Sequence, residues 1–223
     1  MSAAGNEATR GADATADAGM HFYEPAQGHG LKHSPFNSMV APRPIGWIST
    51  RAADGTLNLA PFSFFNAFNY TPPIVGFCST GSETRKDSHA NAEDTGEFCW
   101  NLVTADLAEA MNATSAAVGP EVDEFALAGL TPAESRIVQA PHVAGAKVVF
   151  ECRTTQVVPL TGADGSPTTA TVVFGEVVGV HVDRGCIDEH GVFRTELADP
   201  VTRGGGPTAY YRLGERFDMR RPG

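Results

Sequence analysis

The segment from Ala41 to Asn101 constrains the fold more than any other part of the chain, because three unlike pieces follow one another within it. Two β-rich runs joined by a turn come first. A loop of hydroxyl side chains with Arg85 and Lys86 follows, and a short helical segment then ends at Gly96. This order suits a small barrel that holds a flat, phosphorylated cofactor, since one part can cover a ring edge while another holds an anion.

Length, composition and charge limit the class of protein. The chain has 223 residues, of which 42% are hydrophobic, and this favours one globular domain with a full core. A formal net charge of −10 disfavours a nucleic-acid binder, because phosphate contacts need clustered Lys and Arg. No apolar run is long enough to cross a bilayer, so we expect no membrane-spanning segment.

The first twenty residues are rich in Ala, Gly and Asp and have neither the basic start nor the apolar middle of a secretory signal. We therefore predict a flexible tail over 1–20 and a single domain over 21–223, and we leave open whether Met20 is the true start. The four cysteines are widely spaced, which indicates reduced thiols and a cytoplasmic protein. Cys78 and Cys99 fall in expected strands and are interpreted as core thiols.

Hydrophobic patterning predicts a mainly β fold with a few short helices. Pro61 interrupts a long aromatic run and indicates an edge strand or a bulge. About six strands with two or three helices fit a closed or nearly closed antiparallel barrel. The expected strands cover 45–50, 57–68, 74–79, 97–104, 147–158 and 169–182. A first helix is expected to be capped by Asp87 or Ser88 and to end at Thr95, and two others cover 106–114 and 122–128.

The loop from Ser79 to Ser88 is a candidate anion site. Backbone N–H groups at the start of the following helix favour negative charge, Arg85 can clamp a phosphate, and Lys86 adds a point charge. The alternative is a solvated loop in which the two cations balance Glu83 and Asp87. Taken alone, the composition favours that alternative.

The aromatic run from Asn58 to Asn66 could border a flat ring, which needs hydrogen bonds at its edge and apolar contact on its faces. Most of its phenylalanines are expected in the core, so Asn58 and Ser63 are the better ligand candidates. In the preceding strand, Gly46 allows close backbone approach, whereas Trp47 is a core candidate.

Several familiar chemistries lack their motifs. No GxGxxG follows a strand and no GxSxG is present, which argues against a dedicated Rossmann site and an α/β-hydrolase. His29 and His33 have helical spacing, but the glycines around them argue against a helix, so we expect no metal site there. No side chain is singled out as catalytic.

Together, these pieces resemble the flavin reductase-like family of FMN-binding split barrels, from about Phe36 to Pro222. The segments that carry the resemblance are 41–50, 58–66, a set from Arg85 to Val103, and the motifs Asp123-Glu124-Phe125 and Ala128-Gly129-Leu130. Ser88 stands where the family usually has Thr, and His142 follows Pro141 where Arg is frequent. Near the C-terminus, Gly204-Gly205-Gly206 follows Arg203 where Leu-Gly-Gly is usual.

The resemblance implies an antiparallel, Greek-key-like split barrel and a homodimer with FMN at the interface. It implies that Arg85, Lys86 and Ser88 hold the phosphate, with Ser79 and Asp87 in the same loop. The residues expected along the ring are Trp47, Ile48, Ser49, Thr50, Asn58, Leu59, Ala60, Pro61, Phe62 and Ser63.

The resemblance further implies an FMN-dependent NAD(P)H oxidoreductase that uses NAD(P)H as a transient co-substrate and passes hydride to free flavin or another small acceptor. One alternative is a reductase of a bound organic substrate such as a nitroaromatic or a quinone, and another is a flavoredoxin-like electron carrier. A flavin-dependent monooxygenase is a candidate partner. The sequence leaves the acceptor, the partner and the choice between NADH and NADPH open.

Overall fold

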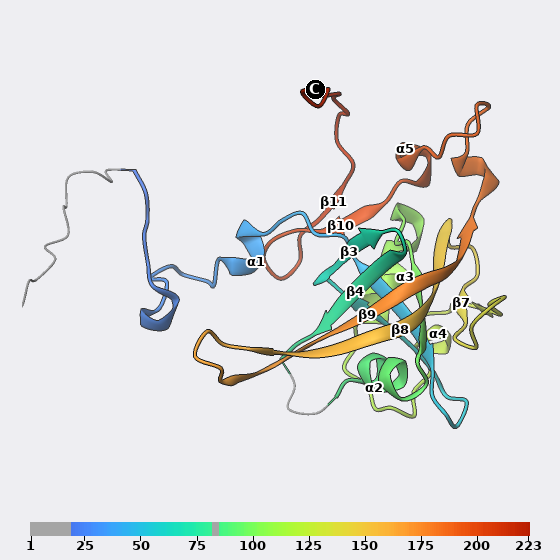
Figure 1. Ribbon diagram of the computed structural model, residues 1–223, viewed down its shortest axis with the longest axis horizontal. Helices are drawn as coiled ribbons and strands as arrows, with labels where there is room; N and C mark the ends of the chain where they lie inside the picture. The colour runs from blue at the N-terminus through green and yellow to red at the C-terminus, as the bar shows by residue number, and fades with distance from the viewer. Residues whose placement is uncertain (1–18, 82–84) are drawn as a thin grey trace, which may run out of the picture. The chain divides into compact units, whose positions relative to one another are not determined.

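The computed structural model describes residues 19–81 and 85–223 (Figure 1). These residues belong to two compact units that divide after Phe36. The tail predicted over 1–20 lies outside the described residues except for Gly19 and Met20, and so do residues 82–84 of the predicted anion loop.

The first unit has little regular structure. It contains the short 3-10 helix η1 (Pro25–Gln27), and the short helix α1 (Phe36–Met39) follows at the division. Nε2 of His21 donates to the carbonyl of His29 at 2.8 Å, and Nδ1 of His29 accepts from the N–H of Leu31 at 3.0 Å. His29 and His33 lie outside helices, as expected from their glycine neighbours.

The second unit is built on one antiparallel sheet of seven strands in the order β2-β1-β5-β8-β9-β4-β3 (Figure 1). The predicted mainly β, antiparallel fold is thereby confirmed. The strands are β1 (Gly46–Arg51), β2 (Leu57–Phe62), β3 (Phe65–Tyr70), β4 (Pro73–Ser79), β5 (Glu97–Asn101), β8 (Val148–Thr161) and β9 (Pro167–Val182).

The expectation of one extended run over 57–68 was wrong. The run is divided into two strands, and for this reason the sheet has seven strands where about six were expected. The break lies at Ser63 and Phe64, and the chain on either side forms the two outer strands, β2 and β3. Pro61 stays within β2, opposite Trp47 of β1. The edge position predicted for Pro61 is confirmed, because an outer strand needs no N–H at alternate positions.

The sheet curls around a core to which all seven strands contribute. The rings of Phe62 in β2 and Phe77 in β4 lie 4.9 Å apart although these strands are not neighbours in the sheet. Phe65 of β3 stacks on Trp100 of β5 with ring centroids 5.4 Å apart. Side-chain packing therefore brings the two ends of the sheet together, as in a barrel left open between its outer strands.

A second core covers the outer face of β1 and β2. Trp47 and Leu59 point to that face and are fully buried, together with Met111 of α3 (Ala108–Ala113) and Phe125 of α4 (Glu124–Leu127). Alternation along the strands sends Ile48 and Phe62 to the barrel core instead. The helix expected over 106–114 starts as the 3-10 turn η2 (Ala105–Leu107).

Helix α2 (Asp87–Asp94) packs against β1, β2 and β5. It begins one or two residues earlier than expected, because Lys86 and not Asp87 or Ser88 occupies the N-cap position. Its end is as predicted, with Thr95 as C-cap and Gly96 at a φ of 74°, a conformation that favours glycine.

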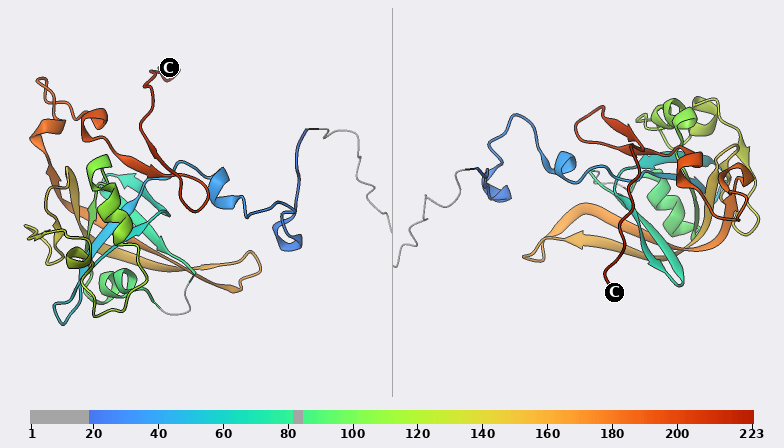
Figure 2. Two further views of the ribbon diagram at one scale, coloured as in Figure 1. Left: turned by 180° about the vertical axis from the view of Figure 1, so that it is seen from behind. Right: turned by 90° about the horizontal axis from the view of Figure 1, so that it is seen from above.

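The β8–β9 hairpin is the longest element and projects beyond the sheet at its turn (Figures 1 and 2). No helix in the described part of the chain is long and apolar enough to span a membrane. The remaining elements are β6 (Pro132–Ala133), β7 (His142–Val143), η3 (Arg184–Cys186), α5 (Thr195–Ala198), β10 (Val201–Arg203) and β11 (Tyr210–Arg212).

Candidate functional site

A cleft of about 410 Å³ lies between β2, the start of α2 and the segment that follows α3. Its volume is within the range of about 300–1,000 Å³ that is usual for small-molecule sites. The structure brings eight of the fifteen predicted cofactor-binding residues to this one cleft: Asn58, Ala60, Pro61, Phe62, Arg85, Lys86, Asp87 and Ser88.

One end of the cleft is suited to an anion. Helix α2 starts there, and the first N–H groups of a helix have no partner within the helix. Lys86, at the N-cap position, makes no side-chain capping bond and is exposed, with Nζ 6.0 Å from the centroid of the Phe62 ring. Because the helix dipole and Lys86 act together, this end of the cleft favours negative charge.

Arg85 is held by carboxylates of the same helix. Its Nη1 donates to Glu93 at 2.7 Å and to Asp94 at 2.9 Å, and its Nη2 donates to the second oxygen of Asp94 at 3.3 Å. These bonds, those to Asp94 first, raise the pKa of the guanidinium. Arg85 is therefore balanced by neighbouring acids, as in the alternative of a solvated loop. Its partners are Glu93 and Asp94 and not Asp87, and Glu83 lies outside the described residues.

The wall of the cleft comes from β2. Asn58, Ala60 and Phe62 share one face of the strand because side chains alternate. The side chain of Leu59 belongs to the second core and does not reach the cleft.

The register of β2 limits its backbone donors. Pro61 has no N–H, so Pro61 and Trp47 form a pair without hydrogen bonds between them. Because hydrogen-bonded and non-hydrogen-bonded pairs alternate along an antiparallel ladder, Leu59 and Ser49, two residues along, also form a non-hydrogen-bonded pair. The N–H of Leu59 therefore faces the outer edge, where it donates to Oε2 of Glu124 at 3.0 Å. The N–H groups of Asn58, Ala60 and Phe62 point to β1, so they are not available to a ligand.

Asn58 is bonded at both ends of its amide. Its Nδ2 donates to Oε1 of Glu124 at 3.0 Å, and its Oδ1 accepts from the hydroxyl of Ser88 at 2.6 Å. Glu124 is the first residue of α4, and the carboxylate of Asp123 caps that helix by accepting from the N–H of Phe125 at 2.8 Å. Burial raises the pKa of Glu124, the bonds from Leu59 and Asn58 lower it, and the negative charge of Asp87 adds to the rise.

Seven predicted residues do not line the cleft. Those of β1 are fully buried: the indole N–H of Trp47 donates to the Thr114 hydroxyl at 3.0 Å, and the Ser49 hydroxyl donates to the carbonyl of Pro141 at 2.6 Å. The carbonyl of Ser63 accepts from Nε of Arg43 at 3.1 Å. The complete set outside the cleft is Trp47, Ile48, Ser49, Thr50, Leu59, Ser63 and Ser79.

Sequence reasoning missed the opposite wall of the cleft. It is formed by the segment 114–118 with Pro120 and by Glu124. The small residues of that segment have no periodicity or motif that marks a binding surface. Glu124 lies in one of the motifs that carry the family resemblance, which gave it no role.

Other titratable groups lie outside the cleft. Glu151 is buried and accepts from three successive N–H groups, those of Arg136, Ile137 and Val138, and from Nε2 of His181 at 2.5 Å. Although burial acts to raise it, these bonds lower the pKa of Glu151 to about 2. Among the described residues, no group of three or more His, Cys, Asp or Glu is placed to hold a metal.

All four cysteines are free. Burial raises the pKa of Cys99 to about 12 and also raises that of Cys78, so both thiols stay protonated near neutral pH. Cys99 is a core thiol as predicted, whereas Cys78 is only half-buried.

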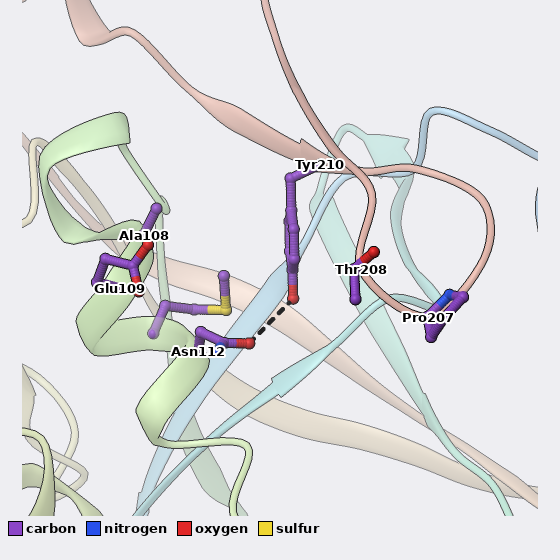
Figure 3. A pocket seen from close by; sticks show the side chains of 7 residues that line it. Ala108, Glu109, Asn112, Pro207, Thr208 and Tyr210 are labelled. Carbon is purple, nitrogen blue, oxygen red and sulfur yellow. Dashed lines mark hydrogen bonds between the residues drawn. The ribbon is translucent and has the colours of Figure 1, made fainter.

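A second cavity, of about 320 Å³, lies between α3 and the turn that leads into β11. In Figure 3 the Tyr210 ring points toward Asn112, and its hydroxyl donates to Oδ1 of Asn112 at 3.5 Å. No predicted cofactor-binding residue lines this cavity, which distinguishes it from the cleft, although the guanidinium of Arg203 lies 4.7 Å from the centroid of the Tyr210 ring.

The chain is similar in sequence and in structure to several known proteins. An uncharacterized protein of Aquifex aeolicus is 40% identical over 79% of this chain and 88% of its own length. The crystal structure of nitrilotriacetate monooxygenase component B from Bacillus cereus has a TM-score of 0.81 and 29% identity, and covers 90% of this chain and 99% of that one.

Two further structures extend the likeness. The 2-nitrobenzoate 2-nitroreductase NbaA of Pseudomonas fluorescens has a TM-score of 0.72 and 27% identity, over 84% of this chain and 88% of that one. A protein of Shewanella frigidimarina described as a putative flavin reductase with split barrel domain has a TM-score of 0.76 over 92% of this chain and 100% of that one, and at 23% identity it supports the fold alone.

The sequence profile of one family, described as "Flavin reductase like domain", matches residues 38–211. The fold is accordingly the split barrel that the sequence predicted. With its curled seven-stranded sheet and this match over most of its length, the chain belongs to the flavin reductase-like family.

Proposed function

We propose that this protein binds FMN in the cleft beside β2 and is an NAD(P)H-dependent oxidoreductase of the flavin reductase type. The observation that carries the proposal is that Lys86 and the start of α2 share one cleft with the apolar wall of Ala60, Pro61 and Phe62. A phosphorylated flat ring combines the two matching features, an anion and an apolar surface.

Bound FMN would supply the redox chemistry, accepting hydride from a reduced nicotinamide and passing electrons to an acceptor. The protein's part is binding and orientation. Lys86, Arg85 and the first-turn N–H groups of α2 bind the phosphate, and the side chains of β2 exclude water along the ring. No side-chain acid or base is required for hydride transfer, and we assign none.

We further propose a homodimer that shares the flavin at its interface, formed by the domain over 21–223 with a tail before it. The strand β3 supports this assembly, because it is an outer strand with five consecutive exposed residues, including Phe68 and Tyr70. An exposed apolar edge strand is usually covered in a native assembly. The four free thiols are consistent with a cytoplasmic location.

Two solved structures above 25% identity favour different acceptors. The likeness to component B of a monooxygenase supports delivery of reduced free flavin to a partner monooxygenase. The likeness to a nitroreductase supports reduction of a bound organic molecule, which is our second candidate function.

Anaerobic mixing of the FMN-loaded protein with NADH or NADPH tests the proposal. We expect one of the two to bleach the absorbance of oxidised flavin rapidly. If neither does, the reductase assignment is wrong and a flavoredoxin-like carrier becomes the better account. Steady-state rates with free FMN, free FAD, a nitroaromatic and a quinone then separate the two candidate acceptors.

A further inference from the structure

Three side chains from three separate elements form one hydrogen-bond chain at the cleft. Ser88 of α2 donates its hydroxyl proton to Oδ1 of Asn58 in β2, and Nδ2 of Asn58 donates to Oε1 of Glu124 in α4. All three residues are buried, with exposed fractions of 1%, 6% and 4%. All three also line the cleft, so the direction of this chain decides what the cleft presents to a ligand.

Glu124 sets that direction. At a pH where Glu124 is ionised, its carboxylate has no proton to donate, so the amide of Asn58 must turn its NH₂ group toward Glu124 and its oxygen toward Ser88, as the structure shows. The second carboxylate oxygen is fixed independently, because the backbone N–H of Leu59 is a donor only. Hydrogen bonds that point along one chain toward a charge also strengthen one another.

The hydroxyl of Ser88 has a single proton, and that proton is committed to Asn58. We propose that Glu124 is a positioning residue which, through Asn58, keeps Ser88 from donating to the phosphate that the proposed function places at the start of α2. Binding of the phosphate then depends on Lys86, Arg85 and the backbone N–H groups. Ser88 fixes the side chain of Asn58 in the wall of the cleft. This inference rests on the proposed FMN site, but the direction of the chain does not.

The substitution Glu124→Gln reverses the chain without leaving a donor unpaired. The Gln carbonyl can accept from the N–H of Leu59, while its NH₂ group faces Asn58 and requires the Asn58 amide to turn over. Asn58 then donates to the oxygen of Ser88, and the hydroxyl proton of Ser88 is released for the phosphate. Because every group keeps a partner, we expect this variant to fold.

A double-mutant comparison tests the proposal through binding. FMN and riboflavin are titrated into Ser88→Ala in the native and in the Glu124→Gln background, since the difference between the two ligands isolates the phosphate. In the native background we expect Ser88→Ala to change the FMN-to-riboflavin affinity ratio less than about threefold. In the Glu124→Gln background we expect a loss of about tenfold or more, the size of a hydrogen bond to a charged group.

Either of two results would overturn the proposal. A loss of tenfold or more in the native background means that Ser88 already donates to the phosphate. An equal effect of Ser88→Ala in both backgrounds means that Glu124 does not control Ser88. The variant Glu124→Asp, which keeps a carboxylate, is the matched control and should behave as the native protein does.

A second measurement needs no flavin. In the NMR spectrum of the flavin-free protein, the side-chain NH₂ protons of Asn58 should show Overhauser contacts to the γ-methylene of Glu124 and none to the β-methylene of Ser88. Glu124→Gln should reverse this pattern. Contacts to Ser88 in the native protein would refute the proposed direction. If FMN fails to bind at all, the proposed function fails, whereas these contacts still decide how the chain is directed.

Discussion

The guanidinium of Arg85 donates to both carboxylate oxygens of Asp94, at 2.9 and 3.3 Å. Arg85 precedes the helix and Asp94 ends it. The cation expected to bind a phosphate at the start of α2 is thus engaged with acids from the end of the same helix. A phosphate must compete with Asp94 and Glu93 for it.

We predict that Asp94→Asn tightens FMN binding by up to about fivefold, because it removes an exposed ion pair of the usual small strength. Titration of the flavin-free protein with FMN measures the change. Glu189→Gln, which removes one negative charge from a residue that does not line the cleft, is the control and should leave the affinity unchanged. Weaker binding by Asp94→Asn would show instead that the carboxylate holds Arg85 in its binding position.

Lys86 makes the larger contribution in this account, because it is exposed at the cleft and has no ion-pair partner among the described residues. Lys86→Ala should weaken FMN binding by about one to two orders of magnitude, as expected for a charge-assisted contact. Riboflavin affinity should not change, since riboflavin has no phosphate. Arg184→Ala, which removes a cation that does not line the cleft, should have no effect on either ligand. Equal losses for the two flavins would place the phosphate elsewhere.

The wall formed by 114–118 is anchored by the bond from the Trp47 indole to the Thr114 hydroxyl. Thr114→Val leaves the buried indole N–H without an acceptor, and we expect a loss of about 1–3 kcal/mol in the free energy of unfolding. Urea denaturation measures the loss. Ser115→Ala removes an exposed hydroxyl that bonds only to the carbonyl of Asn112, and it should stay within about 0.5 kcal/mol of the native protein.

Glu151 should make stability depend on pH. Its pKa is lowered from 4.5 to about 2 in the folded protein, so its stabilising contribution is complete above pH 4.5 and is lost as the pH falls toward 2. The shift corresponds to about 3 kcal/mol. The difference in unfolding free energy between the native protein and Glu151→Gln should therefore be larger at pH 6 than at pH 3. A difference that does not change with pH would contradict the low pKa.

The sequence was sufficient for the fold class because its signals were local. Alternating apolar residues marked the strands, and Gly96 ended α2 where expected. The break at Ser63 and Phe64 was not predictable, since neither residue forces a turn and the aromatic run continues on both sides. The two halves of that run form the two outer strands of the sheet, which is why the structure has one strand more than expected from it.

Residues of the candidate site were predictable only where the residue types within one continuous segment indicated binding. The loop with Lys86 and the run from Asn58 to Phe62 were both found in this way, and they meet at the cleft. The role of Glu124 was not visible, because it depends on a contact between β2 and α4 that are 65 residues apart along the chain. The bonds of Arg85 to acids of the following helix were likewise missed, since nothing local distinguishes Glu93 and Asp94 from other surface acids.

The central claim is that the cleft binds FMN through its phosphate end, and a titration of the flavin-free protein with FMN and riboflavin tests it most directly. We predict saturable binding of one FMN per chain, a yellow protein after dialysis, and an affinity for FMN at least about tenfold above that for riboflavin. A protein that stays colourless after reconstitution, or that binds both flavins equally, would contradict the account.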